Sequence, residues 1–102
     1  MKVTEVILKK SDRKSKKYMV LMQDRGHKHH FGAKGFEDFT THKDPERKER
    51  YIQRHRSRED WSKDGIHTAG FWAKHILWNK PSLRDSIRDT EKKFNIKIIN
   101  QL

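Results

Sequence analysis

Histidine has the clearest capacity for chemistry in this sequence, since seven of the 102 residues are histidines. The stretch His27-Lys28-His29-His30 is the densest cluster, and on a strand His27 and His29 would share one face. Neutral imidazole is a common zinc ligand. No acidic partner stands at a fixed spacing from these rings, so the motif is weak. We predict no metal and no cofactor, and leave the role of His27, His29 and His30 open.

A second group of residues superficially suggests a metal-dependent nuclease. His42-Lys43-Asp44 is followed by His55, but such a site needs a base, metal ligands and a phosphate clamp in one place. Asp44 is better explained as a helix N-cap because Pro45 follows it, and His55 as a half-buried helix residue. The sequence contains no Gly-rich phosphate loop and no serine nucleophile elbow. We therefore predict no catalytic residues and expect that the protein is not an enzyme.

Positive charge is the dominant feature of the composition. Lysine and arginine number 25 against 14 acidic residues, which gives a net charge of +11 and indicates an anionic partner. The predicted helix after Asp44 carries much of this charge. Its core-facing side is a narrow stripe formed by Tyr51, Ile52 and His55, and the rest of its surface is rich in arginine. An exposed helix with an internal Glu46–Arg50 ion pair is the alternative interpretation. The candidate anion-binding residues are Arg47, Lys48, Arg50, Arg54, Arg56 and Arg58, together with Lys14, Lys16 and Lys17 in the basic segment 9–17.

Large apolar residues are concentrated in one later segment. Residues 71–78 contain Phe71, Trp72 and Trp78, and a helix that is apolar nearly all round is buried in its own core or against another protein. These three residues are candidates for an apolar interface, although for most of the segment a core position is the favoured interpretation. Gly70 lies inside this helix at a cost of about 1 kcal/mol, which suggests close packing there or a later helix start.

Several classes of protein are excluded or disfavoured. The absence of cysteine excludes disulfides, cysteine-ligated zinc and thiol catalysis. No apolar run approaches the roughly 20 residues that span a bilayer, so we expect no transmembrane segment. The first ten residues are too charged for a secretory signal, and neither end carries a lipidation motif.

The pattern of apolar residues predicts strands first and helices afterwards. Strands are expected at 3–8 and 18–23 as a hairpin, and a third strand or bent extended segment at 30–39. Helices are expected at 45–58, 68–79 and 82–94, with a last short strand at 96–99. This order predicts one α+β domain over residues 1–102, β-rich at 1–40 and helical at 44–94. We expect a small N-terminal antiparallel β-hairpin or three-stranded sheet packed with about three C-terminal helices.

Residues 32–94 also carry a run of short motifs in a familiar order. The most distinctive blocks are Phe71-Trp72 and Leu77-Trp78-Asn79-Lys80-Pro81. The run resembles a largely uncharacterised family of small basic proteins from nucleocytoplasmic large DNA viruses, of the chlorella virus and giant virus type. Its other parts are Gly32-Ala33-Lys34-Gly35-Phe36, Asp38-Phe39-Thr40, His42-Lys43-Asp44, Glu46-Arg47-Lys48, Arg50-Tyr51, Arg54-His55, Arg58-Glu59, Trp61, Thr68-Ala69-Gly70, Ser82-Leu83 and Ser86-Ile87.

The resemblance implies a viral context and leads to two hypotheses. The preferred one is a minor capsid or cement protein that bridges capsid subunits of a large icosahedral virion, in several copies, after assembly in the host cytoplasm. Its partners would be other capsid proteins, held by the aromatic anchors and the arginine-rich helix. The alternative is a sequence-nonspecific nucleic-acid-binding protein for DNA condensation or packaging, with Phe31, Phe36 or Tyr51 stacking on unpaired bases.

Overall fold

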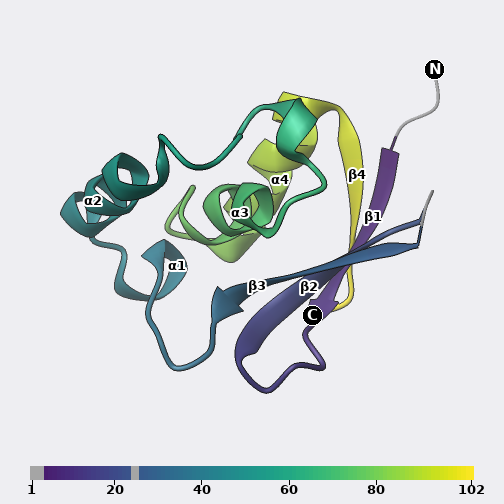
Figure 1. Cartoon of the computed structure of the whole chain (residues 1–102), viewed down its shortest axis with the longest axis horizontal. Helices are drawn as coiled ribbons and strands as arrows, with labels where there is room; N and C mark the ends of the chain where they lie inside the picture. Colours follow the sequence, from purple (N-terminus) through teal and green to yellow (C-terminus); the bar gives the residue numbers. More distant parts are fainter. Residues whose placement is uncertain (1–3, 24–25) are drawn as a thin grey trace.

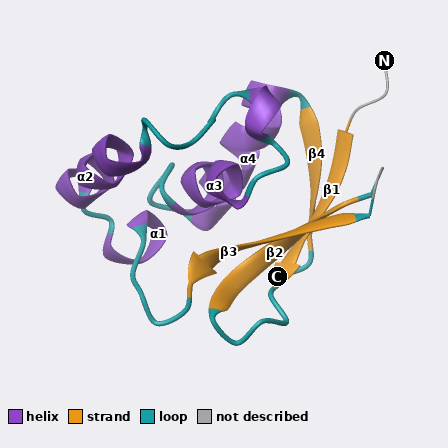
Figure 2. Cartoon of the chain, viewed as in Figure 1, coloured by secondary structure: helices purple, strands orange, loops and turns teal. Residues whose placement is uncertain are grey.

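The computed structural model describes residues 4–23 and 26–102, and it has the predicted α+β architecture. Four strands form one sheet in the order β3-β2-β1-β4. The strands are β1 (Thr4–Lys10), β2 (Lys16–Met22), β3 (His27–Ala33) and β4 (Ile96–Asn100). The first three are antiparallel neighbours, whereas β4 lies parallel to β1. The helices lie on one side of this sheet (Figures 1 and 2).

The alternation of side chains along the strands separates a buried face from a more open one. Val6 and Leu8 are fully buried in β1, and Val6 is paired with Met22 of β2 and Ile98 of β4. Ile7 points to the opposite face, where its neighbours in register are Leu21 and Ile99. These three aliphatic residues are half-buried. They form a row across the sheet face that lies away from the helices.

The hairpin and the last strand confirm the prediction, but the third strand differs from it. β3 begins at His27 instead of residue 30, and it ends at Ala33. Gly32 has φ +79, a left-handed conformation that other residues rarely adopt, and a Cβ there would press on Leu77. The chain therefore leaves the sheet early, and Phe39 begins a helix instead of ending a strand.

The helical half of the chain follows its predicted caps. The helices are α1 (Phe39–His42), α2 (Pro45–His55), the 3-10 turn η1 (Lys63–Gly65), α3 (Ala69–Trp72), η2 (Ala73–Leu77) and α4 (Leu83–Phe94). The side chains of Asp44, Thr68 and Ser82 accept hydrogen bonds from the first-turn backbone of α2, α3 and α4. α2 ends at His55, three residues before the predicted end. Among the described residues, no helix is long and apolar enough to cross a membrane.

The predicted helix at 68–79 is one continuous segment with a change of winding. Its second half, η2, is a π-helix, and the N–H of Trp78 donates to the carbonyl oxygen of Ala73 at 3.2 Å. The expected close packing at Gly70 is present, because a Cβ there would collide with the Glu59 carboxylate.

One hydrophobic core joins the sheet to α3, η2 and α4. Phe71, Trp72 and Ile76 are fully buried at its centre, and Ile87 joins them from α4. The indole N–H of Trp72 donates to the carbonyl oxygen of Ile66 at 2.8 Å, so the only polar atom of this buried ring is satisfied. Trp78, Leu83 and Phe94 are partly buried and pack against the core, as expected from the short link between η2 and α4.

Candidate functional site

A groove of about 400 Å³ lies between α2, the segment after β3 and η2. Arg47 and Arg54 line it from α2, and Phe36 lines it from the loop between β3 and α1. Leu77 and Trp78 contribute apolar surface from η2 and the residue that follows it. The volume falls in the range of small-ligand pockets, roughly 300–1,000 Å³. In this groove the predicted basic helix meets an exposed aromatic ring.

The position of α2 beside the groove is fixed by one buried stripe. Tyr51 stacks on Trp78 with ring centroids 4.3 Å apart and planes 2° from parallel. The centroid of the His55 ring lies 4.3 Å from that of Tyr51. Burial raises the pKa of Tyr51 to about 12, so this phenol stays neutral. Tyr51 therefore holds the helix on the core, and its ring is not free to stack on a base.

Lys48 has the same structural role, which corrects its assignment to the anion-binding surface. Its Nζ donates to the carbonyl oxygen of Asn79 at 2.6 Å and lies 5.0 Å from the centre of the Phe39 ring. Burial, followed by the nearby Lys80, lowers the pKa of this ammonium group. The side chain of Lys48 is thus engaged in attaching α2 to the segment after η2.

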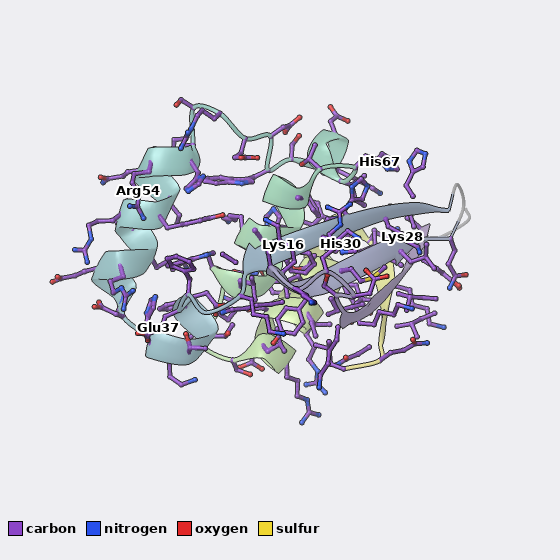
Figure 3. The ribbon with its side chains drawn as sticks, turned by 60° about the horizontal axis from the view of Figure 1, so that its bottom comes forward. Lys16, Lys28, His30, Glu37, Arg54 and His67 are labelled. Atoms are coloured by element: carbon purple, nitrogen blue, oxygen red, sulfur yellow. The ribbon has the colours of Figure 1, made fainter. Side chains whose placement is uncertain are left out.

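The arginines of α2 divide into two groups. Arg47, Arg50, Arg54 and Arg58 recur at intervals of three and four residues, so they lie along one side of the helix and just beyond its end. We call these four residues the arginine row. Arg56 is exposed on another side. Figure 3 shows Arg54 on α2, and Lys16 and Lys28 on the sheet.

The arginine row has little internal neutralisation. Within the described residues, the ion pairs are Lys17–Asp38, His30–Asp12 and Arg47–Glu37. The nitrogen and oxygen atoms of the Arg47–Glu37 pair are 3.8 Å apart, and both side chains are exposed to solvent. The Glu46–Arg50 ion pair that was the alternative interpretation is not formed among the described residues. An exposed pair of this kind contributes about 0–1 kcal/mol, so the row keeps its positive potential.

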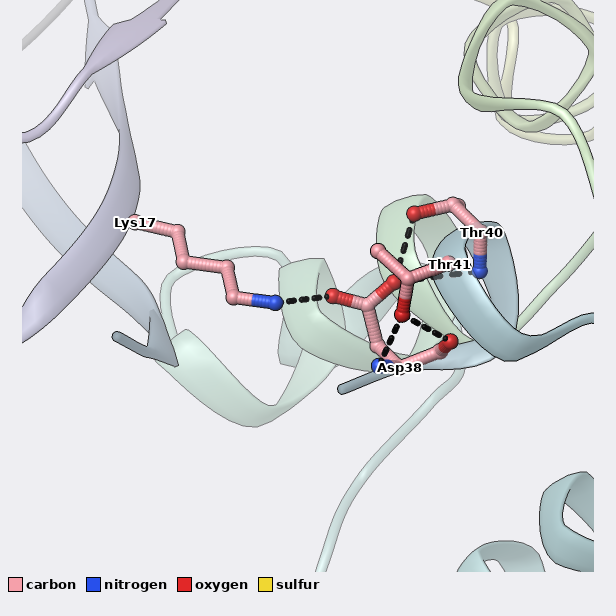
Figure 4. Close-up of polar contacts among 4 residues, drawn as sticks. All are labelled: Lys17, Asp38, Thr40 and Thr41. Carbon is pink, nitrogen blue, oxygen red and sulfur yellow. Dashed lines mark hydrogen bonds and ion pairs between the residues drawn. The ribbon is translucent and has the colours of Figure 1, made fainter. Parts of the chain in front are cut away.

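The three candidate lysines of the basic hairpin also differ in how far they are free to bind an anion. Lys14 is exposed at the tip, and Lys16 is half-buried at the start of β2. Lys17 lines the groove, but its Nζ donates to Asp38 Oδ2 at 2.7 Å (Figure 4). Asp38 is only 3% exposed and also caps α1 through Thr40 and Thr41. The charge of Lys17 is therefore neutralised within the molecule, which corrects its place among the anion-binding residues.

The apolar interface candidates are mostly core residues. Phe71 and Trp72 are 0% exposed, so neither can contact a partner, and the prediction for them was wrong. Trp78 is half-buried and forms part of the groove wall. Of the three residues considered for base stacking, Phe31 and Tyr51 are buried, whereas Phe36 is 72% exposed. Phe36 is the most exposed of the aromatic rings that line the groove.

His42, His55 and His30 occupy separate environments. His42 accepts a hydrogen bond from the Asp44 N–H at 2.9 Å, and Asp44 itself caps α2, so the nuclease-like spacing is a structural feature. His55 is half-buried as predicted, and burial, followed by Arg58, lowers its pKa. His30 lies 2.7 Å from the Ser11 hydroxyl, on the sheet face opposite to His29.

Sequence reasoning missed one member of the histidine cluster. His27 and His29 share a strand face as predicted, and His67, which precedes α3, joins them with ring centroids about 6 Å away. Burial, followed by His67, His27 and His30, lowers the pKa of His29. No local motif marks His67, because it reaches β3 only through the packing of the turn that follows η1.

Comparison with known proteins identifies a similar family whose function is unknown. No curated protein and no solved structure matches the chain. The matching segment, residues 6–55, runs from β1 through α2 and includes Phe36, Arg47 and Arg54 of the groove. Over that segment, just under half of its length, the chain is similar to a protein family of unknown function, DUF5754.

Proposed function

We propose that this protein is a non-enzymatic, sequence-nonspecific nucleic-acid-binding protein. The observation that carries the proposal is the arginine row of α2, which lies beside a groove with an accessible phenylalanine and which, among the described residues, forms one ion pair, the 3.8 Å contact between Arg47 and Glu37. Guanidinium groups bind phosphate with two parallel hydrogen bonds. Phosphate contacts release counterions and require no particular base sequence.

The groove supports single-stranded nucleic acid over a duplex. Single strands are held by a positive surface that follows the backbone and by aromatic rings on which bases stack. The arginine row supplies the first feature and Phe36 the second, with Trp78 and Leu77 as the apolar wall between them. Because Phe36, Arg47 and Arg54 line the same groove, a base stacked on Phe36 would place its strand beside two guanidinium groups of the row.

The first test replaces Arg47, Arg50, Arg54 and Arg58 together with Gln, which keeps helix propensity. Single-strand affinity should fall for every sequence alike, and the slope of log affinity against log salt should shrink by about 2–3. Phe36→Ala should weaken single-strand binding by a further roughly 1–3 kcal/mol and leave duplex binding nearly unchanged. Fluorescence anisotropy at several salt concentrations measures both effects.

The matched control changes four exposed basic residues of α4, which are Arg84, Arg88, Lys92 and Lys93. Replacing these with Gln removes the same net charge from another surface. The control should therefore keep most of the affinity and of the salt slope. Equal losses in the two quadruple variants would show a nonspecific charge effect and contradict the assignment of the groove.

A second candidate function is a minor capsid or cement protein, located in the virion of a large DNA virus and bound to other capsid proteins. The open sheet row of Ile7, Leu21 and Ile99 favours it, because a half-exposed aliphatic strip can be covered by another protein. Two of the three aromatic anchors that first favoured this hypothesis, Phe71 and Trp72, are in the core, so it ranks below nucleic-acid binding. Separating virions into shell and core distinguishes the two: recovery with the shell supports this candidate, and recovery with the DNA core contradicts it.

A further inference from the structure

Three imidazole rings from two distant parts of the chain meet at one end of the sheet. His27 and His29 stand two residues apart on β3, and His67 comes from the segment between η1 and α3. The ring centroids are 5.9 Å apart for His27 and His67, 6.2 Å for His29 and His67, and 6.4 Å for His27 and His29. Each ring therefore neighbours both others, and Figure 3 shows His67 close to β3.

The hydrogen bonding of this cluster is incomplete. Nε2 of His29 is buried and has no hydrogen-bond partner. Leaving a buried polar nitrogen without a partner is costly, so such atoms in folded proteins usually indicate a missing water, ion or ligand. Within the described residues, no ion pair involves His27, His29 or His67. The group that completes this cluster should therefore be a species that imidazole nitrogens can bind.

The separations are close to those of a three-histidine metal site. Zinc–nitrogen bonds of about 2.0–2.1 Å place three tetrahedrally arranged ring centroids about 5–5.5 Å apart. The observed separations exceed this by roughly half to one ångström, and among the described residues no group of three ligating side chains is already arranged to hold a metal ion. His27 and His67 are exposed, so both rings have room to change rotamer, and metal binding requires that they move toward His29.

We propose that His27, His29 and His67 bind one divalent transition-metal ion of the zinc class through three imidazole nitrogens. Imidazole ligands suit zinc, copper and nickel, and they disfavour magnesium and calcium, which require oxygen ligands. The fourth position is left to water. Bound metal would join β3 to the turn before α3, so the site would cross-link the sheet to the helical layer independently of the nucleic-acid groove.

The test is calorimetric titration of the full chain with zinc chloride, at neutral pH and in a buffer that does not chelate metal. One ion should bind per chain. His27→Ala, His29→Ala and His67→Ala should each lower the affinity by at least about tenfold, because each removes a direct ligand. His30→Ala is the matched control, since His30 belongs to the same sequence cluster but faces the other side of the sheet. It should bind zinc as the native protein does.

A second measurement keeps the proposal testable if a variant fails to fold. In the native protein, zinc should shift the imidazole ¹⁵N resonances of His27, His29 and His67 and leave that of the buried His75 unchanged. Failure to bind zinc at millimolar concentration would overturn the proposal. Binding that survives in His67→Ala, or that is lost in His30→Ala, would equally overturn it, because the ion would then be held by other residues.

Discussion

At the scale of single residues, His75 is the titratable group with the most unusual surroundings. Its ring is 2% exposed and lies between Phe71 and Phe94, with centroid separations of 4.5 and 4.7 Å. Burial lowers its pKa to about 4, although the hydrogen bond from its Nε2 to the Trp61 carbonyl opposes this shift. Lys74 and Lys93 lower the pKa further, and Asp89 raises it slightly. The ring is therefore neutral in the folded protein at physiological pH.

The pKa of His75 makes the stability of the protein fall in acid. An unfolded chain binds a proton on this histidine near pH 6.5, whereas the folded protein does so only near pH 4. The contribution of the neutral His75 ring to the free energy of unfolding is complete above about pH 6.5. As the pH falls to about 4, the free energy of unfolding decreases by up to about 3 kcal/mol. Urea unfolding should show this loss, and His75→Gln should show a shallower pH dependence. An NMR titration midpoint near 6.5 for the folded ring would contradict the prediction.

Residue identity predicted some side-chain roles and not others. Asp44 and Ser82 were recognisable as caps because a cap depends only on the next few residues. The burial of Phe71 and Trp72 depends on which helix face meets the sheet, and no local pattern in a helix that is apolar nearly all round specifies that face. The exposure of Phe36 depends on the path of the loop between β3 and α1, which no local pattern specifies either. Likewise, Lys17 and Lys48 are basic residues in basic segments, and only the folded chain brings them to Asp38 and to the Asn79 carbonyl.

At the scale of elements, the π-helix η2 depends on α4. The Thr90 hydroxyl lies 3.1 Å from the His75 carbonyl oxygen of η2 and 2.8 Å from the Ser86 carbonyl oxygen of its own helix. Thr90 is completely buried. The backbone carbonyl groups of a π-helix are placed differently from those of an α-helix. Carbonyl groups that lack a backbone N–H partner can then accept hydrogen bonds from neighbouring side chains. Thr90 therefore links the irregular segment to the regular helix that packs on it.

Thr90→Val tests this link, because valine has nearly the shape of threonine and no hydroxyl. We expect the free energy of unfolding to fall by about 1–3 kcal/mol, since a buried carbonyl loses its donor. Thr4→Val, at a half-exposed strand position, is the control and should change stability by less than about 0.5 kcal/mol. Amide hydrogen exchange should also become faster in η2. Unchanged stability and exchange in Thr90→Val would contradict the role of the hydroxyl.

Element boundaries were predictable where hydrophobic periodicity and caps agreed. The hairpin, α4 and β4 meet that condition, and each lies within about two residues of its predicted bounds. β3 does not, because its histidines and lysine carry no alternation, and the three phenylalanines after them suggested a later strand. The parallel pairing of β4 with β1 connects the two ends of the chain, and nothing local in either strand indicates its partner.

At the scale of the whole molecule, the fold separates its apolar layer from a surface of excess positive charge. A single core lies between the sheet and the helices, so most lysine and arginine side chains are directed outward. The net charge is +11, and only Lys17 and Arg47 of the described lysines and arginines lie within 4.0 Å of a carboxylate. Repulsion between the positive charges of such a surface destabilises the folded state. Salt or an anionic partner screens this repulsion.

The last prediction is that the free protein becomes more stable as salt is added. Raising the ionic strength shortens the screening length from about 30 Å at 0.01 M to about 8 Å at 0.15 M, which is below the spacing of many surface charges. We expect a gain of about 1 kcal/mol over this range, or about 4–8 °C in Tm for a chain of this size. Thermal unfolding in sodium chloride measures it, with sucrose as the uncharged comparison. The variant with the arginine row changed to Gln lacks four of the eleven net charges, so its Tm should rise less with salt. A Tm that falls with salt in the native protein would mean that attractive charge pairs outweigh repulsion, and the anionic partner would lose its main physical basis.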